Sequence, residues 1–516
     1  MAEAPTATLG ALPELAAQRH GSTAFLADMA WDAYGRPVHN IVDFADAVFD
    51  YADRFWAAGI RPGDVVAVIQ RNHIEVQALA CALNRIGALP VLLSARMEPA
   101  ELLQCVAKLD RPDVALDGFG LSRFAGHADA LRHLTKRLLY IGREDADAGG
   151  LTPTGERAAH QVHPRGPDEW AVITHTSGTT GVPKLAAHST RSLFGMVEVQ
   201  IAASRKFGEV GLSAKHLSFV HVRTVSIVLA FMEVAMPLLA ITDTDPERVR
   251  GLMLEHRPES LETHPNVFIQ WEPVATHPSR PFSTVGRYVS TFDAMHPRTI
   301  RTLLAASDHP RVHYLQGYGQ TETGAVCVRV VTRAEVDAYR PRNVGLPVPN
   351  AAVRIVDPNG ATVPNGQQGA IETMSPGQFR GYLGESGPQP TGSWWAMGDI
   401  GRLRPDGSLD ILDRIVDHAE GTESFLELED DLLDRFPELV ELVLLRPADE
   451  QDLVAVACPR SDEHFDVERF TAAAAELGME RLTVHVRKWE DLPLTGSYKV
   501  RRGALRAQLA TERVVP

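Results

Sequence analysis

The chain carries the stretch THTSGTTGVPK at residues 174–184, at the end of an apolar, strand-like run that begins at Trp170. Gly178 and Gly181 allow backbone amides to approach an anion closely, and Lys184 adds a positive charge. The hydroxyl groups of this loop belong to Thr176, Ser177, Thr179 and Thr180. The combination predicts a loop that binds a polyphosphate, and an ordinary Ser/Thr/Gly-rich surface loop is the alternative. The spacing does not match GxxxxGK[ST], which excludes a P-loop NTPase.

The segments before this loop alternate between apolar, β-rich runs and helical periodicity. Residues 65–69 (VVAVI) and 89–93 (LPVLL) predict strands. Between them, residues 73–87 carry apolar side chains at helical spacing, and another helix is expected over 101–109. Strands separated by such helices are typical of βαβ units. The sequence therefore predicts an α/β fold with mainly parallel sheets that are covered on both faces.

The pattern changes in the last third of the chain. Residues 354–373 read as short strands joined by Asn-Gly turns, which predicts an antiparallel, β-rich subdomain. After Asp413 a smaller α+β unit is expected. Its elements are a helix over 425–436, strands over 439–446 and 453–459, and a helix over 467–478.

The composition is that of a globular protein, with 44% hydrophobic and 23% charged residues among 516. The formal net charge is −15, which argues against a nucleic-acid partner and against an anionic membrane surface. The four cysteines form no CxxC pair, so we expect neither a disulfide framework nor a zinc ribbon. This cysteine usage fits a reducing compartment.

One apolar run resembles a membrane span in composition only. Residues 225–241 are interrupted by Glu233 and Pro237 and fall short of the ~20 residues that a bilayer requires. We therefore expect a buried core helix there. Residues 1–18 lack the basic start and the continuous apolar stretch of a signal peptide, so we expect a cytoplasmic protein without a membrane anchor.

The phosphate-type loop, followed by His188 and Ser189, closely resembles that of the adenylate-forming superfamily. This superfamily includes acyl- and aryl-CoA synthetases, nonribosomal-peptide adenylation domains and luciferases. Further motifs resemble those of the family and follow in its order along nearly the whole chain. GYGQTE at 317–322 resembles the family's YGxTE, and GDIGR at 398–402 with Asp406-Gly407 resembles its GDxGxxxxDG. Asp413-Arg414 resembles the hinge motif, and PLT at 493–495 with Lys499 resembles PxTxxGK. Taken together in this order, the motifs are far more specific than any one of them.

The resemblance implies a two-step reaction. An acid attacks the α-phosphate of ATP and gives an acyl-adenylate and pyrophosphate. A small domain then rotates, and a nucleophile, usually a thiol, displaces AMP. On this basis residues 1–412 are expected to form the adenylation domain, residues 413–416 the hinge, and residues 417–516 a small, mobile C-terminal domain.

The resemblance also implies roles for individual residues. Read in isolation, Tyr318 would be a core aromatic residue and Asp399 a turn carboxylate. By resemblance, Tyr318 stacks on adenine, Thr321 touches the α-phosphate, Glu322 holds Mg²⁺, Asp399 accepts both ribose hydroxyls, Arg414 contacts the ribose, and Lys499 bridges the acid and the α-phosphate. A cation at that place suits a transition state that gathers negative charge.

Two departures from the family pattern concern the acid. Where the family carries a glycine-rich segment, residues 290–294 read STFDA, so Phe292 fills space that an acyl chain would need and favours a small acid. The alternative is that Phe292 turns into the core. His221 ends a hydrophobic strand that lies near the acid in the family, with a core histidine as the alternative. With Asp293 and Gly317 these residues form the predicted substrate pocket. Members that activate α-amino acids use an aspartate near this strand to hold the amino group. No aspartate near His221 matches it, which argues against an amino-acid substrate, although Glu233 is close in sequence.

A third departure concerns the acceptor. After the hinge the family commonly reads DxIKxxG and uses this loop to form a thiol tunnel, whereas Glu420 and Glu423 stand at the lysine and glycine positions here. Tyr498 also replaces the glycine before Lys499. Two carboxylates would repel a phosphopantetheine phosphate. The sequence therefore supports adenylation more strongly than transfer of the acyl group to a thiol.

The sequence thus predicts an ATP- and Mg²⁺-dependent ligase that activates a small carboxylic acid, aromatic acids included. By family frequency, coenzyme A or the phosphopantetheine thiol of a carrier protein accepts the acyl group. One alternative keeps adenylation but uses an amine acceptor, as in relatives that activate nitrite to diazotise an aryl amine. The other is a catalytically silent nucleotide-binding protein.

Overall fold

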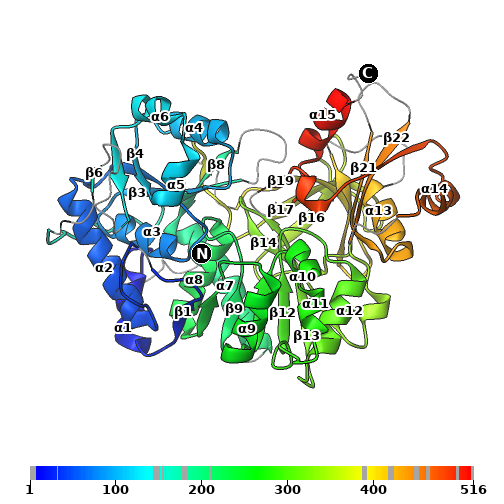
Figure 1. Ribbon diagram of the computed structural model, residues 1–516, viewed down its shortest axis with the longest axis horizontal. Helices are drawn as coiled ribbons and strands as arrows, with labels where there is room; N and C mark the ends of the chain where they lie inside the picture. Colours follow the sequence, from blue (N-terminus) through cyan, green and yellow to red (C-terminus); the bar gives the residue numbers. More distant parts are fainter. Residues whose placement is uncertain are drawn as a thin grey trace.

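Four β-sheets organise the computed structural model, two of them eight-stranded (Figure 1). The structure describes residues 7–31, 33–142, 152–153, 156, 158–176, 183–207, 211–385, 392–415, 424–446, 452–460, 465–495 and 499–512. Over this part of the chain, helices cover both large sheets, and the fold is mixed α/β, as the sequence predicts.

The first large sheet has the order β18-β8-β7-β3-β2-β4-β5-β6. Its strands are β2 (Val65–Gln70), β3 (Leu89–Ser94), β4 (Asp113–Leu116), β5 (Arg137–Tyr140), β6 (Thr152–Pro153), β7 (Trp170–His175), β8 (Leu185–Ser189) and β18 (Gly381–Tyr382). Neighbours from β7 through β6 run parallel, whereas β8 returns antiparallel to β7. The predicted strands at 65–69 and 89–93 are confirmed as β2 and β3.

Alternate residues of these strands enter separate cores. Val66 and Val68 face one core with helix α3 (Glu75–Arg85) and helix α2 (Ile41–Ala57). Ala67 and Ile69 face the other core, on the side of helix α4 (Pro99–Ala107). The sheet is therefore covered on both faces, which explains why its strands are continuous apolar runs rather than alternating ones.

The second large sheet has the order β1-β10-β9-β11-β12-β13-β14-β15. Its strands are β1 (Phe25–Ala27), β9 (Ser213–Lys215), β10 (Leu238–Ala240), β11 (Ser260–Thr263), β12 (Arg287–Ser290), β13 (His313–Gln320), β14 (Gly324–Thr332) and β15 (Leu346–Pro347). One face buries Leu261, Tyr288 and Tyr314 in an apolar core. This core also contains residues of α9 (Pro246–His256), α10 (Pro265–Gln270), α11 (Glu272–Ala275) and α12 (Pro297–Ala306).

The apolar run at 225–241 forms two elements rather than one. Helix α8 (Val222–Val234) ends at Ala235, whose φ of 55° is left-handed. Pro237 then precedes strand β10. Proline cannot donate the backbone hydrogen bond that a continuing helix needs, so the run divides there. The expectation of a buried helix is right for the first part only. In the described residues, no helix is both long and apolar enough to cross a membrane.

The remaining sheets are smaller. An antiparallel sheet contains β16 (Ala352–Val356), β17 (Gly369–Met374), β19 (Trp395–Leu403) and β20 (Leu409–Arg414). A three-stranded sheet contains β21 (Leu439–Leu445), β22 (Leu453–Pro459) and β23 (Leu482–Val486). Helices α13 (Phe425–Arg435), α14 (Val467–Glu476) and α15 (Arg502–Glu512) accompany the latter sheet.

The predicted hinge residues Asp413 and Arg414 still belong to β20, where they pair with Ile400 and Asp399. Glu420 and Glu423 lie outside the described residues.

Candidate active site

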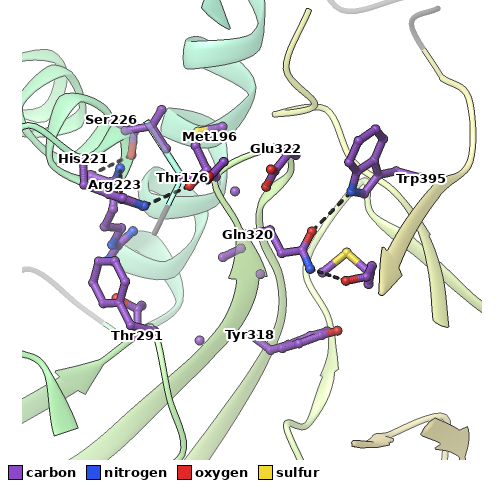
Figure 2. Close-up of a pocket in the computed structure, with 18 of the residues that line it drawn as sticks. Thr176, Met196, His221, Arg223, Ser226, Thr291, Tyr318, Gln320, Glu322 and Trp395 are labelled. Atoms are coloured by element: carbon purple, nitrogen blue, oxygen red, sulfur yellow. Dashed lines mark hydrogen bonds between the residues drawn. The ribbon is translucent and has the colours of Figure 1, made fainter. Parts of the chain in front are cut away.

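A cavity of about 590 Å³ lies between the two described ends of the phosphate-type loop, the C-terminal end of β13, the start of α8 and Lys499 (Figure 2). Many residues predicted from the sequence line it: Thr176, Lys184, His221, Phe292, Gly317, Tyr318, Thr321, Glu322, Arg414 and Lys499. Segments that are more than three hundred residues apart in the chain therefore meet at one place. In Figure 2, His221, Arg223 and Ser226 stand on one side of the cavity and Trp395 on the other.

Tyr318 and Asp399 are joined across two sheets. The Tyr318 hydroxyl donates a hydrogen bond of 2.6 Å to Asp399 Oδ2, and Arg414 Nε lies 3.6 Å from Asp399 Oδ1. Burial raises the pKa of the Asp399 carboxyl, while Arg414 and the Tyr318 bond oppose this shift. The arrangement places an aromatic face in the cavity wall, with a carboxylate and a guanidinium behind it, which suits a base and its ribose.

Glu322 is buried where the cavity meets the phosphate-type loop. Its Oε1 accepts a hydrogen bond of 2.5 Å from the Tyr382 hydroxyl. The Lys184 ammonium lies 4.3 Å from the centre of the Tyr382 ring. Burial raises the pKa of Glu322, whereas the Tyr382 bond and the charge of Lys184 lower it. A bound cation would complete the neutralisation of this carboxylate.

The base of the phosphate-type loop is closed by two hydrogen bonds. Thr176 N donates to Lys184 O at 2.9 Å, and Lys184 N donates to Thr176 Oγ1 at 3.1 Å. These bonds hold the two loop ends together at the mouth of the cavity. The predicted phosphate contacts Ser177, Gly178, Thr179, Thr180 and Gly181 lie outside the described residues.

His221 is the N-cap of α8, and it faces the cavity. Its Nδ1 accepts a hydrogen bond of 3.0 Å from Arg223 N, so its proton resides on Nε2, which lies 3.1 Å from Thr321 Oγ1. Burial lowers the pKa of His221 to about 3, helped by nearby cationic side chains. The imidazole is therefore neutral and donates to Thr321, which orients the Thr321 hydroxyl in the cavity.

Phe292 closes the cavity beside His221. Its φ of 85° is left-handed, a conformation that suits glycine and is strained for a bulky residue. The phenyl ring lies 4.9 Å from the His221 ring and 4.5 Å from the His264 ring, measured between centroids. The ring is therefore held against two histidines and does not turn away from the cavity. Asp293 is exposed and lines a neighbouring cavity instead.

Lys499 reaches the cavity from the C-terminal segment. Thr495 N donates to Lys499 O at 2.8 Å, and Lys499 N donates to Thr495 Oγ1 at 3.1 Å. Two residues further on, Arg501 forms an ion pair of 2.6 Å with Glu101 of helix α4. Burial lowers the pKa of Lys499, and the carboxylates of Asp293 and Asp399 oppose that shift.

The C-terminal unit is held in this position by further ion pairs. Arg342 contacts Asp430 of α13 at 2.8 Å, and Arg460 contacts Glu272 of α11 at 2.9 Å. Together with the Arg501–Glu101 pair, these contacts place Lys499 over the same cavity as Thr321. The structure therefore brings the Lys499 ammonium and the Thr321 hydroxyl to the wall of one cavity.

Sequence reasoning missed several residues of the cavity wall. These are Met196, Val199, Gln200, Val222, Arg223, Ser226, Thr291, Gln320, Tyr382 and Trp395. Among the described residues, the buried Thr291 Oγ1 finds no hydrogen-bond partner. Trp395 Nε1 donates to Gln320 Oε1 at 3.3 Å (Figure 2). Gln320 could have been found from the sequence, because it lies in the Gly-Gln-Thr-Glu motif. The cavity residues on helices could not, because their sequence pattern is that of ordinary buried helix positions.

The residues fit ATP and Mg²⁺. The unpartnered Thr291 hydroxyl, the buried Glu322 and the inward Lys499 all offer polar groups to a ligand that binds in the cavity. The described residues contain no cluster of three or more His, Cys, Asp or Glu able to hold a metal. A single carboxylate beside the phosphates suits Mg²⁺, which usually takes one or two protein carboxylates together with substrate phosphates.

Fold and site together define an adenylate-forming, nucleotide-binding architecture. A family model described as AMP-binding enzyme matches residues 15–383, and the chain belongs to this family. The chain is 34% identical to 3-amino-2-hydroxy-4-methoxybenzoate diazotase from Streptomyces cremeus, over 89% of this chain and 88% of that protein. It is 26% identical to a feruloyl-CoA synthase from Amycolatopsis, over 96% of both chains.

Solved structures share the fold. The amide bond synthetase McbA from Marinactinospora thermotolerans superposes with a TM-score of 0.77 at 20% identity, and covers 97% of this chain and 99% of that chain. The O-succinylbenzoate coenzyme A synthetase from Bacillus subtilis, in complex with ATP and magnesium ion, gives 0.76 at 17% identity, over 96% of this chain and 99% of that chain. Family membership confirms the resemblance drawn from the motifs.

Proposed function

We propose that this protein uses ATP and Mg²⁺ to adenylate nitrite and transfers the activated nitroso group to an aryl amine. The observation that carries the proposal is Phe292, whose ring closes the acid end of the cavity against His221 and His264. We infer that the ring leaves room at this end only for an acid of a few atoms. The similarity to a diazotase over most of the chain supports the same conclusion.

The first step needs negative charge to be stabilised at the α-phosphate. A nitrite oxygen attacks the α-phosphorus of ATP, a mixed nitrous–phosphoric anhydride forms, and pyrophosphate leaves. Lys499 and the Thr321 hydroxyl, which His221 orients, line the place where this charge develops. Tyr318, Asp399 and Arg414 would hold the nucleoside, and the loop from Thr176 to Lys184 the phosphates. Mg²⁺ held by Glu322 would neutralise phosphate charge.

The second step needs an amine next to the anhydride. The amine nitrogen attacks the nitroso nitrogen, the bond to the phosphate oxygen breaks, and AMP leaves. The nitrosamine formed then gains a proton and loses water to give the diazonium ion. Met196, Val199 and Val222 offer an apolar wall for an aromatic ring. The proton of the amine passes to solvent, because both ring nitrogens of the neutral His221 are engaged, Nδ1 with Arg223 N and Nε2 with Thr321 Oγ1.

Rotation of the small domain belongs to the same proposal. We infer that residues 1–412 bind the nucleotide, that residues 413–416 act as the hinge, and that residues 417–516 move between the two steps. The ion pairs that join Arg501 to Glu101 and Arg342 to Asp430 would have to break for this rotation.

A second candidate is adenylation of a small aryl acid followed by transfer to coenzyme A or a carrier-protein thiol. The similarity to feruloyl-CoA synthase over nearly the whole chain favours it. Glu420 and Glu423 argue against this candidate, because they replace the lysine and glycine of the thiol loop and their carboxylates would repel a phosphopantetheine phosphate.

Pyrophosphate release distinguishes the candidates. Purified protein is mixed with ATP, Mg²⁺ and either nitrite or a small aryl acid, first alone and then with an aryl amine or coenzyme A. We expect nitrite to support pyrophosphate release, and an added aryl amine to give a diazonium ion that couples to a phenol as a coloured azo dye. Release with the aryl acid but not with nitrite, followed by stoichiometric thioester when coenzyme A is added, would replace the proposal by the second candidate.

A further inference from the structure

A short segment from Thr291 to Arg298 joins the acid end of the active site to the C-terminal unit. It begins where strand β12 ends and leads into helix α12. Thr291 and Phe292 line the large cavity, whereas His296 and Arg298 contact α13 and the residues that follow it. We call residues 291–298 the connecting segment.

The far end of the connecting segment binds the C-terminal unit directly. Arg298 Nη1 donates to Pro437 O at 2.5 Å, and Arg298 Nη2 donates to Leu439 O at 3.3 Å. These carbonyls lie between the end of α13 and the start of β21. His296 Nδ1 caps α12 by accepting from Arg298 N at 3.3 Å, and His296 Nε2 lies 3.2 Å from Asp434 Oδ1 on α13. The segment therefore forms part of the surface on which the C-terminal unit docks.

A polar network extends the docking contact of Arg298. A cation beside the free carbonyls at the C-terminal end of a helix is stabilising. Arg460 of the C-terminal unit donates to the same Pro437 O at 3.3 Å and pairs with Glu272 of α11 at 2.9 Å. The hydroxyl of Thr299, the residue after Arg298, donates to Glu272 at 2.5 Å. The start of α12 is thus joined to the C-terminal unit by several linked bonds.

The near end of the connecting segment is strained. Phe292 has a φ of 85°, which is unfavourable for a bulky residue. Such a conformation persists only where the surrounding contacts hold the backbone in place. The phenyl ring packs on His221 and His264, but ring packing alone does not require this φ. The docking contacts at the other end of the segment are a second source of constraint.

The connecting segment has little slack. From Phe292 to His296 the chain spans at most about 14 Å when fully extended. Met295, between them, is fully buried in the apolar core of the second large sheet. Pro297 fixes its own φ in the first turn of α12. We therefore expect a backbone change at Phe292 to reach His296 and Arg298 rather than to be absorbed on the way.

We propose that docking of the C-terminal unit holds Phe292 in its strained conformation, and that relaxation of this strain promotes release of the unit after adenylation. While His296 and Arg298 contact the unit, the segment stays in the strained form. When the unit leaves, Phe292 returns to an ordinary backbone conformation. Arg298 is a positioning residue in this mechanism, because it acts through the unit that carries Lys499. The inference rests on the proposed rotation of the small domain, but not on the identity of the acid.

Hydrogen exchange in the full-length protein tests the strain. Exchange is measured in peptides that span α13 and the start of β21, for the wild type, Phe292→Gly and Phe292→Ala. Glycine adopts a φ of 85° without strain, whereas alanine keeps the strain and lacks the ring. We expect exchange in Phe292→Gly to be at least about fivefold slower than in the wild type, because strain no longer opposes docking, and Phe292→Ala to stay within about twofold. Equal exchange in Phe292→Gly and the wild type would overturn the proposal.

Variants of two docking arginines identify the route. Arg298→Met should speed this exchange at least about fivefold, and Arg298→Lys, which keeps the charge, should restore part of the protection. In the Arg298→Met background, Phe292→Gly should change exchange by less than about twofold, because the strain is no longer coupled to docking. The matched control is Arg501→Met, which breaks the ion pair with Glu101 of α4, away from the connecting segment. It should speed exchange but leave the full effect of Phe292→Gly. An equal effect of Phe292→Gly in both backgrounds would exclude the connecting segment as the route.

Single-turnover kinetics measure the consequence for the reaction. Nitrite and benzoate are each mixed with ATP and Mg²⁺, and pyrophosphate release reports adenylation. Aniline or coenzyme A is then added, and AMP release reports the second step. We expect the second step of Phe292→Gly to be at least about fivefold slower than that of Phe292→Ala, with adenylation no slower, because only glycine removes the strain. If the second step were equally fast in the two variants, strain would not promote release of the unit.

The two proposals fail differently. If Arg298→Met and Arg501→Met both leave exchange in α13 unchanged, the C-terminal unit does not detach, and the proposed rotation and this inference are both wrong. If both variants speed exchange but Phe292→Gly does not slow it, the rotation stands and the role of the strain is overturned.

Discussion

Replacement of Phe292 tests the acid end of the active site most directly. The residue combines two features with opposite consequences for stability: a left-handed backbone with φ of 85°, and a ring in contact with His221 and His264. Phe292→Gly removes both features, and Phe292→Ala removes only the ring. The pair of variants therefore separates the strain of the backbone from the packing of the side chain.

The magnitudes follow from the structure. Each ring pair contributes about 0.5–1.5 kcal/mol, so loss of both contacts costs about 1–3 kcal/mol. A left-handed non-glycine residue costs about 1–3 kcal/mol, which glycine recovers and alanine does not. We expect Phe292→Gly to remain within about 1 kcal/mol of the wild type, and Phe292→Ala to be less stable than Phe292→Gly by about 1 kcal/mol or more.

Thermal unfolding and pyrophosphate release measure the two consequences. Both variants should adenylate aryl acids at least tenfold faster than the wild type, since the phenyl ring no longer occupies the acid end. Nitrite should lose affinity, because water fills the enlarged space. If alanine were as well tolerated as glycine, the backbone strain would be wrongly assigned. If both variants kept the acid preference of the wild type, Phe292 would not define the size of the acid.

Four further outcomes are expected. Lys499→Ala should lower adenylation at least about a hundredfold while ATP still binds, because one transition-state charge contact is lost; adenylation within tenfold of the wild type would contradict this. Glu322→Gln should lower turnover and raise the Mg²⁺ concentration needed for half-maximal rate, and an unchanged Mg²⁺ titration would exclude the metal role. Burial lowers the pKa of His188 to about 3 and that of His216 to about 4, so the unfolded chain binds more protons between pH 4 and 6.5. The free energy of unfolding should therefore fall on going from pH 7 to pH 5, by up to about 2 kcal/mol for each histidine, and a pH-independent urea midpoint would refute it. Coenzyme A should stimulate AMP release poorly compared with an aryl amine, and a low-micromolar KM for coenzyme A with stoichiometric thioester would reverse the choice of acceptor.

The fold was predictable because its strands are separate apolar runs with clear turn signals. Residues 65–69 and 89–93 became neighbouring parallel strands, and the helix expected between them formed as α3. The run at 225–241 was not resolved correctly, because its apolar residues suit a buried helix and a buried strand equally. Only the left-handed Ala235 and the following Pro237 divide it, and an alanine gives no signal for that conformation.

The predicted nucleotide contacts could be named from the sequence because they lie in short motifs whose order and spacing resemble those of the family. The opposite wall of the cavity could not be named, because Arg223, Ser226 and Gln200 lie on helices among ordinary buried residues and reach the cavity only through the packing of α7 (Thr190–Phe207) and α8 against the sheet. A second case is the buried group of ionisable side chains on three strands of the second large sheet. Lys215, Glu262 and Arg287 are far apart in sequence and come together only in the register of β9, β11 and β12. Side chains that are brought together only by the register of three strands leave no local pattern in the sequence, so the motifs of this chain predict the reaction type but not the acid.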